Sequence, residues 1–331
     1  MKAKQFIRLG LSITLAGVFV WLIISQINPD ELRKAFADTN PSWLTAALAA
    51  FSIGYTFRIQ RWRLMLTTEN PRLSWLACAG PFLASFATNN VLPFRAGDVL
   101  RAFAFNGRLS TSASVVLATL FVERLLDLLM VILLLLSALL VFQLDANRFA
   151  GLGRSALAAI ATGILLVMVF PQLFFPVARI TGRLATKISP RLGQKLSHEI
   201  DKILTALSNL AKGKRISKLL VCSVIAWLAE GFVFWFAALA LPALTAPEAG
   251  WLALPVGTLA TLIPSTPGYI GTFDYFTGYA MTALGNSQSA ALGFALLVHV
   301  LLWLPPTIVG GLYLALHPSK PKPAEEINSC Q

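Results

Sequence analysis

Three charged residues lie inside a long apolar run, in the stretch FVERLLDLLM at residues 121–130. If a helix begins near Ser112, Glu123 lies about 16 Å along it, close to the middle of a bilayer. A charged group at that depth costs roughly 2.5–3.5 kcal/mol, so it must face a polar interior. Glu123 and Asp127 share a helix face, and Arg124 lies three residues from Asp127, so the three can partly neutralise one another. Two compatible interpretations follow: an ion-pair clasp between helices, or the wall of a functional cavity.

A second polar stretch, NNVLPFRAGDVLRAF, precedes the first. Pro93 breaks a helix there, and Gly97 permits a close approach or an unusual turn. Freed backbone donors together with Arg95 would form an anion site at membrane depth, and the planar guanidinium group suits phosphate. We expect Asp98 and Arg101 to pair with the charges of the first stretch. The alternative is an ordinary turn whose arginines extend to the membrane surface.

A third stretch, IPSTPGYIGTFDYF, lies near the C-terminal end and is predicted to mirror the second. Pro267, Gly268 and Gly271 break its backbone, and Pro267 to Gly271 repeats the P-x-x-x-G spacing of the first break. Asp274 is the lone acid of this segment. We infer that the two breaks are counterparts, although two similar Gly/Pro-rich breaks can also arise by chance.

Two further titratable residues, Glu230 and His299, lie in the middle of apolar runs. No Lys or Arg is near Glu230 in sequence, so its partner must come from the first half of the chain, or it is protonated. A lone histidine in such a run is more often a satisfied core residue than a proton carrier. Glu230, Asp274 and His299 are therefore secondary candidates for the site.

The composition places all these residues in a membrane protein. The chain has 331 residues, of which 56% are hydrophobic and 13% charged, with a mean hydropathy of +0.70. Soluble domains average about 25% charged residues. Six apolar runs approach the length that spans a bilayer: 6–27, 43–57 with its flanks, 115–142, 155–177, 219–241 and 289–316. We predict an all-α polytopic protein with about six full spans and two broken or re-entrant segments, hence up to eight helices. A barrel is excluded because the runs are continuous rather than alternating.

The distribution of Lys and Arg predicts the orientation. Basic residues at the N-terminus, in the loop 178–218 and after the last span place all three on the cytoplasmic side. Arg58, Arg61, Arg63 and Arg72 mark the cytoplasmic end of the second span. The loop 178–218 is expected to contain an amphipathic helix on the membrane surface, or to be a solvated loop that only fixes topology.

The predicted order of elements divides the chain into two similar halves. An integral membrane domain over 1–316 would consist of one half at about 5–143 and another at about 155–316, followed by a short cytoplasmic tail, 317–331. Each half reads helix, helix, broken segment, helix, with opposite orientation. This is the layout of an inverted-topology repeat, whose working site lies at the broken segments. The first of these, 75–108, is expected to be re-entrant or a closely packed helix pair.

Several function classes are not indicated. The net charge of +12 could suggest a nucleic-acid partner, but the Lys and Arg residues cluster in loops, as orientation signals do. The three cysteines form no CxxC motif, so neither a metal site nor a disulfide framework is predicted. Walker, Rossmann, HExxH and GxSxG motifs are absent from the sequence. We expect no nucleic acid, no metal, no cofactor and no enzymatic activity.

Together, VLPFRAGDVLRAF, FVERLLDLL and TPGYIGTFDYF resemble the lysylphosphatidylglycerol synthase transmembrane-region family, also called flippase-like or UPF0104, over roughly residues 5–316. The resemblance implies a multi-pass bacterial or archaeal membrane domain linked to lipid translocation. In bifunctional members a soluble aminoacyl transferase domain follows, whereas this chain ends at Gln331. A stand-alone member without synthase activity is therefore expected. The matching motif positions, expected to bind a lipid headgroup, are Arg95, Gly97, Asp98, Arg101, Glu123, Arg124, Asp127, Pro267, Gly268 and Gly271.

The main hypothesis is a protein of the cell (inner) membrane that translocates or accommodates an anionic lipid headgroup, from a phospholipid or a polyprenyl-phosphate glycolipid. The rival is a non-transporting scaffold for a lipid- or glycan-modifying enzyme, and a weaker third option is an intramembrane enzyme acting on a lipid phosphate. A transporter should have a polar cavity lined by Arg95 and Glu123. A scaffold should have a filled, self-paired charge cluster.

Overall fold

The computed structural model describes residues 36, 38–92, 95–145, 153–176, 186, 194, 205, 207–208, 214–263 and 267–317. Every regular element in these residues is a helix. Three helices are long and apolar enough to cross a membrane: α7 (Ala113–Val141), α12 (Arg215–Leu239) and α15 (Gln288–Leu316). This confirms the all-α polytopic prediction. The helix expected at 6–27, most of the loop 178–218 with its amphipathic helix, and the tail beyond His317 lie outside the described residues.

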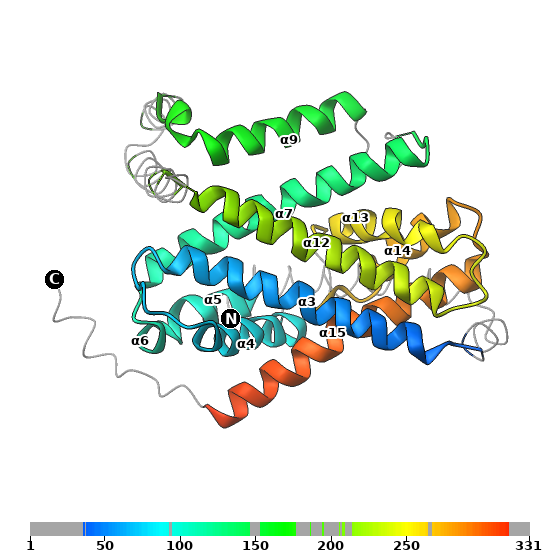
Figure 1. Ribbon diagram of the computed structural model, residues 1–331, viewed down its shortest axis with the longest axis horizontal. Coiled ribbons are helices and arrows are strands. Elements are labelled where there is room, and N and C mark those ends of the chain that lie inside the picture. The colour runs from blue at the N-terminus through cyan, green and yellow to red at the C-terminus, as the bar shows by residue number, and fades with distance from the viewer. Residues whose placement is uncertain are drawn as a thin grey trace.

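The second predicted span is α3 (Pro41–Leu66), which lies antiparallel to α12 (Figure 1). Asn40 caps its N-terminus by accepting a hydrogen bond from the backbone of Ser42, and Pro41 suits the first helical position. At Gly54 the backbone of α12 is close, since a Cβ there would be in ordinary contact, 3.4 Å from the backbone oxygen of Ala226. The two helices therefore form a tight pair along their length.

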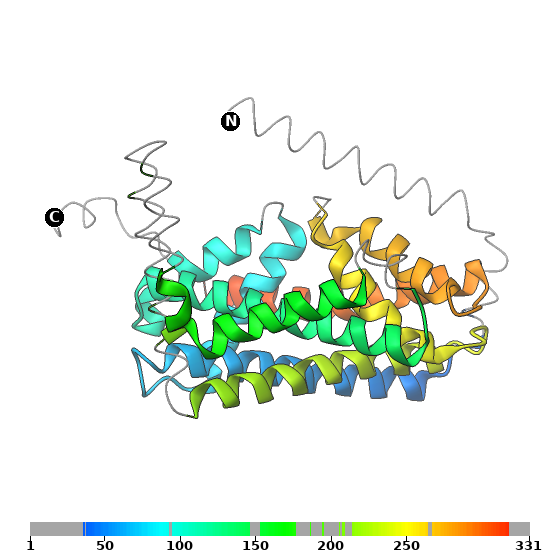
Figure 2. The ribbon, with the colours of Figure 1, turned by 90° about the horizontal axis from the view of Figure 1, so that it is seen from above.

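Both broken segments are closely packed helix pairs. The first consists of α4 and α5, with the short α6 after them, and the second of α13 and α14, with the 3-10 turn η3 between them. In Figure 2 the first pair (cyan) and the second pair (yellow to orange) lie toward opposite ends of the molecule, and α4 contacts η3 where the two approach each other. The bounds are α4 Trp75–Val91, α5 Ala96–Phe103, α6 Asn106–Leu109, α13 Gly250–Ala260, η3 Pro267–Tyr269 and α14 Thr272–Thr282.

The order of elements repeats with reversed direction. The series α3, α4–α5, α7 recurs as α12, α13–α14, α15, and the counterparts run in opposite directions (Figure 1). The last helix of each series, α7 or α15, has 29 residues. This is the arrangement that an inverted repeat predicts.

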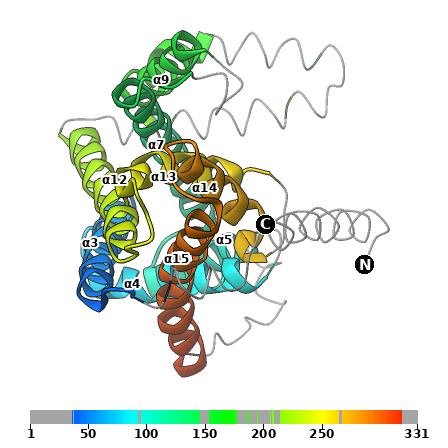
Figure 3. The ribbon, with the colours of Figure 1, turned by 90° about the vertical axis from the view of Figure 1, so that its right-hand side faces the viewer.

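The apolar run predicted to span at 155–177 forms a shorter helix than expected. Helix α9 (Arg154–Val169) has 16 residues and is followed by the 3-10 turn η1 (Pro171–Phe174). Phe170 leaves the helical region because a residue before proline is disfavoured there. Helix α9 packs against α7 at the edge of the bundle (Figure 3).

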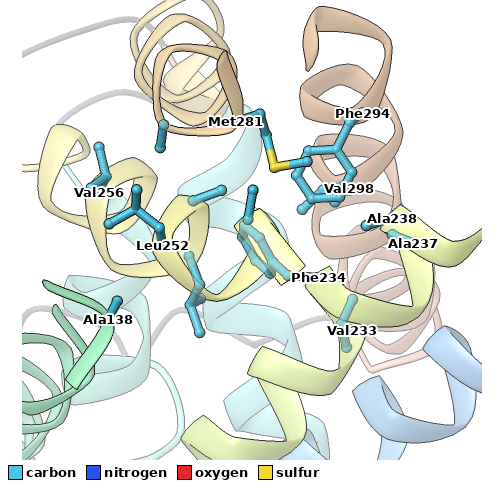
Figure 4. Packing of buried hydrophobic residues seen from close by; sticks show 14 of the residues in the cluster. Ala138, Val233, Phe234, Ala237, Ala238, Leu252, Val256, Met281, Phe294 and Val298 are labelled. Carbon is cyan, nitrogen blue, oxygen red and sulfur yellow. The ribbon is translucent and has the colours of Figure 1, made fainter. Parts of the chain in front are cut away.

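A large apolar core joins the second half of the molecule to α7 (Figure 4). Phe234 of α12 lies between α13, α14 and α15, with its ring edge-on to those of Phe273 and Phe294. Gly231 receives the ring of Trp251, which leaves no room for a Cβ. The 3-10 turn η2 (Pro247–Ala249) leads from α12 into α13. This packing fixes the base of the second helix pair and so positions its tip.

Candidate functional site: a charged cavity between the two breaks

A cavity of about 440 Å³ lies where the two breaks meet. Residues from both halves line it, and they include charged groups, carboxamides, hydroxyl groups and aromatic rings. Its charged and histidine lining residues are Arg58, Arg95, Arg124, Asp127, Glu230 and His299. Polar and charged groups inside a membrane protein are expensive and mark functional sites. The cavity is therefore the candidate site.

Two arginines of α3, which the sequence places at the predicted cytoplasmic end of this span, are buried in this network. Arg58 forms an ion pair with Glu230 of α12. Arg61 lies 2.8 Å from Asp127 of α7 and donates a hydrogen bond to Ser223. Arg58 and Arg61 are three residues apart and so share a helix face, which was the available sequence signal. The prediction that Glu230 takes its partner from the first half is confirmed.

Arg101 and Glu123 form a closed clasp that does not line the cavity. The Arg101 guanidinium lies 2.9 Å from the Glu123 carboxylate, and their side chains are 0% and 2% exposed. The rings of Trp62 and Phe82 lie 4.8 and 4.9 Å from the guanidinium carbon. The expected pairing of Arg101 with the charged stretch is confirmed, but the expectation that Glu123 lines a cavity is wrong.

Asp98 links the first break to α7. Its carboxylate accepts hydrogen bonds from Arg124, at 3.1 Å, and from the Asn89 amide, at 3.0 Å. Asn89 in turn accepts a hydrogen bond from the backbone N–H of Gly97 at 2.8 Å. A Cβ on Gly97 would lie 1.9 Å from the backbone oxygen of Ser85, so Gly97 serves the close approach of α5 to α4. The alternative of an unusual turn at this glycine is wrong.

The charges of FVERLLDLLM pair with other helices rather than with one another. Glu123 pairs with α5, Arg124 pairs with α5 one turn earlier, and Asp127 pairs with α3. These partners come from two helices, α5 and α3, so the ion pairs join α7 to both. Arg124 also attracts Glu123 and Asp127 electrostatically, so the expected partial neutralisation within the triplet holds beside these interhelical ion pairs.

Arg95 differs from the other arginines of the network. It has no carboxylate within ion-pair distance in the part of the chain that the structure describes, and its Nε donates a long hydrogen bond, 3.4 Å, to Tyr269 Oη of the opposite break. Arg95 has φ 53° and Tyr269 has φ 61°, so each break places a residue other than glycine in the left-handed region. Such backbone strain clusters at functional sites. Arg95 is therefore a cation at the cavity without an acidic partner.

The second break supplies a histidine–carboxylate pair. His299 Nδ1 lies 2.7 Å from an oxygen of Asp274, and the other oxygen accepts a hydrogen bond from the Gly271 backbone at 2.9 Å. Gly268 and Gly271 have φ of 70° and 90°, which explains the need for glycine at both. The prediction that this mid-helix histidine has a hydrogen-bond partner holds for Nδ1. The residue also lines the cavity.

The structure thus separates the predicted site residues into three groups. Those at the cavity are Arg95, Arg124, Asp127, Gly268, Glu230 and His299. Those that support its wall are Gly97, Asp98, Gly271 and Asp274, and Pro267 begins η3. Arg101 and Glu123 are apart from it. Within the described residues, no three His, Cys, Asp or Glu side chains are grouped to hold a metal ion.

Comparison with known proteins places the chain in a family. Residues 6–310 match the family described as "Lysylphosphatidylglycerol synthase TM region". The chain is 25% identical to the UPF0104 membrane protein MJ1078 of Methanocaldococcus jannaschii, over 68% of this chain and 91% of that protein. It is 22% identical to the UPF0104 membrane protein PH1989 of Pyrococcus horikoshii, over 93% and 96%. It is also 25% identical to the glycosyltransferase AglD of Haloferax volcanii, over 92% of this chain but 53% of that protein. The chain therefore belongs to the lysylphosphatidylglycerol synthase transmembrane-region family.

Proposed function

We propose that this membrane protein admits the headgroup of an anionic lipid into the cavity between its two breaks and moves it across the membrane. The observation that carries the proposal is Arg95, a cavity-lining guanidinium without an acidic partner in the described residues. The other arginines at the cavity, Arg58 and Arg124, are held by Glu230 and Asp98. Arg95 is thus the cation with free donors, and a guanidinium group binds phosphate in a bidentate manner.

The rim of the cavity supports a ligand that keeps its tails in the bilayer. Leu262 lines the cavity and is 66% exposed. Other exposed apolar side chains lie on both helix pairs close to the breaks, namely Val91, Leu92, Val99 and Ile270. A polar chamber with an apolar rim suits a molecule with a charged head and hydrocarbon chains. The cargo class we propose is an anionic phospholipid or a polyprenyl-phosphate glycolipid.

We further propose that the protein resides in the cell membrane with both termini in the cytoplasm, that it acts without a metal or cofactor, and that it does not itself catalyse a reaction. The family is described as the transmembrane region of a synthase, which supports the proposal that this chain does not itself catalyse a reaction. The basic residues in the loop 178–218 support the orientation.

Lipid movement in proteoliposomes tests the proposal. The purified protein is reconstituted with labelled phosphatidylglycerol or a labelled polyprenyl-phosphate sugar, alongside Arg95→Gln and the exposed control Arg72→Gln. We expect wild type and Arg72→Gln to move one of these lipids faster than empty liposomes, and Arg95→Gln to lose at least about tenfold in rate, the cost of one charge-assisted contact. Absence of movement of either lipid by folded wild type, or full activity of Arg95→Gln, would refute it.

A second candidate function has its own support. The Arg101–Glu123 clasp is the filled, self-paired cluster expected of a scaffold, and a relative that contains a matching region is a glycosyltransferase. The chain would then hold a lipid- or glycan-modifying enzyme at the membrane. Co-purification of such an enzyme with wild type and equally with Arg95→Gln, together with no lipid movement, would favour this alternative.

A further inference from the structure

The His299–Asp274 pair is a feature that headgroup binding at Arg95 does not use. His299 lies in the middle of the apolar helix α15 and lines the cavity, and Asp274 is 2% exposed at the start of α14. The carboxylate is an acceptor, so at 2.7 Å the Nδ1 of His299 is the donor. Among the described residues, the other ring nitrogen, Nε2, has no hydrogen-bond partner. The ring thus has one side fixed by Asp274 and one nitrogen available to the cavity.

This geometry makes Nε2 a site for a proton. In neutral imidazole with Nδ1–H, Nε2 is an acceptor, and after protonation it becomes a donor with a positive charge. Protonation therefore adds a cation to a cavity whose anion-binding group is Arg95. The hydrogen bond from Nδ1 to Asp274 can persist in both states, so the ring keeps its orientation when Nε2 gains or loses the proton. Histidine is the side chain whose charge ordinarily changes between pH 5 and 8.

Other charged groups around the cavity do not replace this role. On α3 and α12, Arg58 and Glu230 are paired with each other, and on α7, Asp127 is paired with Arg61. Arg124 of α7 is paired with Asp98, and Arg95, just before α5, is a permanent cation. Tyr55 and Tyr269 are the cavity's phenols, and the lining residues of α4 and α13 carry carboxamides, hydroxyl groups and apolar groups. Among the described lining residues, His299 is thus the one whose ring offers an unpaired nitrogen as a proton acceptor.

Asp274 also connects the proton site to the break itself. Its second oxygen holds the backbone N–H of Gly271, at φ 90°, and this residue lies two positions after Tyr269, the contact of Arg95. A change of charge on His299 therefore acts on the same turn that faces the headgroup-binding arginine. Ligand and proton would each favour the binding of the other, because such coupling is reciprocal.

We propose that His299, oriented by Asp274, is a proton-binding site that loads one proton together with one anionic headgroup. The proton is taken from water in the cavity onto Nε2 and is released from the same atom on the opposite side. This inference rests on the proposed function and adds to it an energy source, since a pH gradient could then drive the lipid from the acidic to the alkaline side.

The test uses the same proteoliposomes with an imposed pH gradient, labelled phosphatidylglycerol, and the labelled polyprenyl-phosphate sugar if the former does not move. Variants are His299→Gln, Asp274→Asn and, as matched control, His317→Gln, an exposed histidine at the end of the same helix. We expect wild type and His317→Gln to move lipid at least about fivefold faster with the acidic side as the source than with the gradient reversed. His299→Gln should move lipid at one rate in both directions, and Asp274→Asn, which removes the carboxylate that orients the ring, should reduce the difference between the two directions.

The two proposals fail in different ways. If wild type moves lipid at the same rate with either gradient, or if His299→Gln retains the dependence, the proton site is refuted and the proposed function stands. If folded wild type moves neither lipid at any pH, the proposed function fails and the coupling with it. The elution volume in size-exclusion chromatography and the thermal unfolding of each variant in detergent identify a misfolded variant. In that case, the rates of wild type under the two opposite pH gradients decide whether the proton site is refuted.

Discussion

The clasp and the cavity use the same residue types for opposite purposes. In the clasp, Arg101 has Glu123 as its counter-charge, and the rings of Trp62 and Phe82 lie against the buried guanidinium group. In the cavity, less than two helical turns away along α5, Arg95 has no acidic partner in the described residues and faces open volume. The difference lies in the surroundings: aromatic rings fill the space around Arg101, whereas the meeting of two breaks leaves space around Arg95.

Our proposal assigns function to the intramembrane charge that has no counter-charge and a structural role to the charges that have one. A buried ion pair contributes little net stability, since desolvation offsets its attraction, but loss of one partner leaves an uncompensated charge. The clasp should therefore respond to substitution with a loss of stability, and Arg95 with a loss of function. Three substitutions test this, in order of expected effect.

Glu123→Ala should lower the free energy of unfolding by about 3–5 kcal/mol, because it leaves the buried Arg101 without a counter-charge. Equilibrium unfolding in mixed micelles, followed by tryptophan fluorescence, measures this. The double variant Arg101→Met/Glu123→Leu removes both charges and should recover most of the loss and retain lipid movement. If the double variant folds normally but moves no lipid, the clasp belongs to the transport pathway and the contrast fails.

Gly97→Ala should cost about 1–3 kcal/mol of stability, since its Cβ would lie 1.9 Å from the backbone oxygen of Ser85 and α5 must move away from α4. The shift displaces Arg95 and Arg101 together, so both stability and lipid movement should fall. Gly107→Ala is the matched control, because a Cβ there meets nothing within 4 Å. Equal stability of the two variants would mean that α5 is not held against α4 as described.

Arg95→Gly should have the smallest effect on stability and a large one on function. A left-handed residue with a side chain costs about 1–2 kcal/mol, and glycine relieves this at an entropic cost of about 0.5–1 kcal/mol. The free energy of unfolding should therefore rise by roughly 0.5–1 kcal/mol while lipid movement is lost. A destabilised Arg95→Gly protein would show that Arg95 makes structural contacts that outweigh its backbone strain.

Much of this arrangement could be predicted from local sequence. The proline and glycine residues of both breaks mark where the helices end, and apolar periodicity marks the long helices. The need of Glu230 for a partner followed from its burial in an apolar run. The expected pairing of Asp98 and Arg101 with the charged stretch was correct because the sequence offers few other counter-charges at that depth.

The rest depends on contacts that no local pattern contains. In the sequence, Arg58 and Arg61 look like arginines at the end of a membrane span. Only the packing of α12 and α7 shows that Glu230 and Asp127 are their partners. The left-handed residue of the first break is Arg95 rather than Gly97, because the approach of α5 to Ser85 decides where glycine is required. Helix α9 is shorter than predicted because Pro171 ends it. The prediction relied on the length of the apolar run and did not take this proline into account.

The ion pair between Arg58 and Glu230 joins residues 172 positions apart, and this separation has a consequence for biosynthesis. At about 5–20 residues per second, roughly 10 to 30 s pass between the synthesis of the arginine and that of its partner. During this interval Asp127 is the acid within ion-pair distance of both Arg58 and Arg61, so two cations of α3 share one carboxylate before Glu230 exists. The second carboxylate arrives only with α12, so a nascent chain truncated before α12 should remain exposed to membrane quality control.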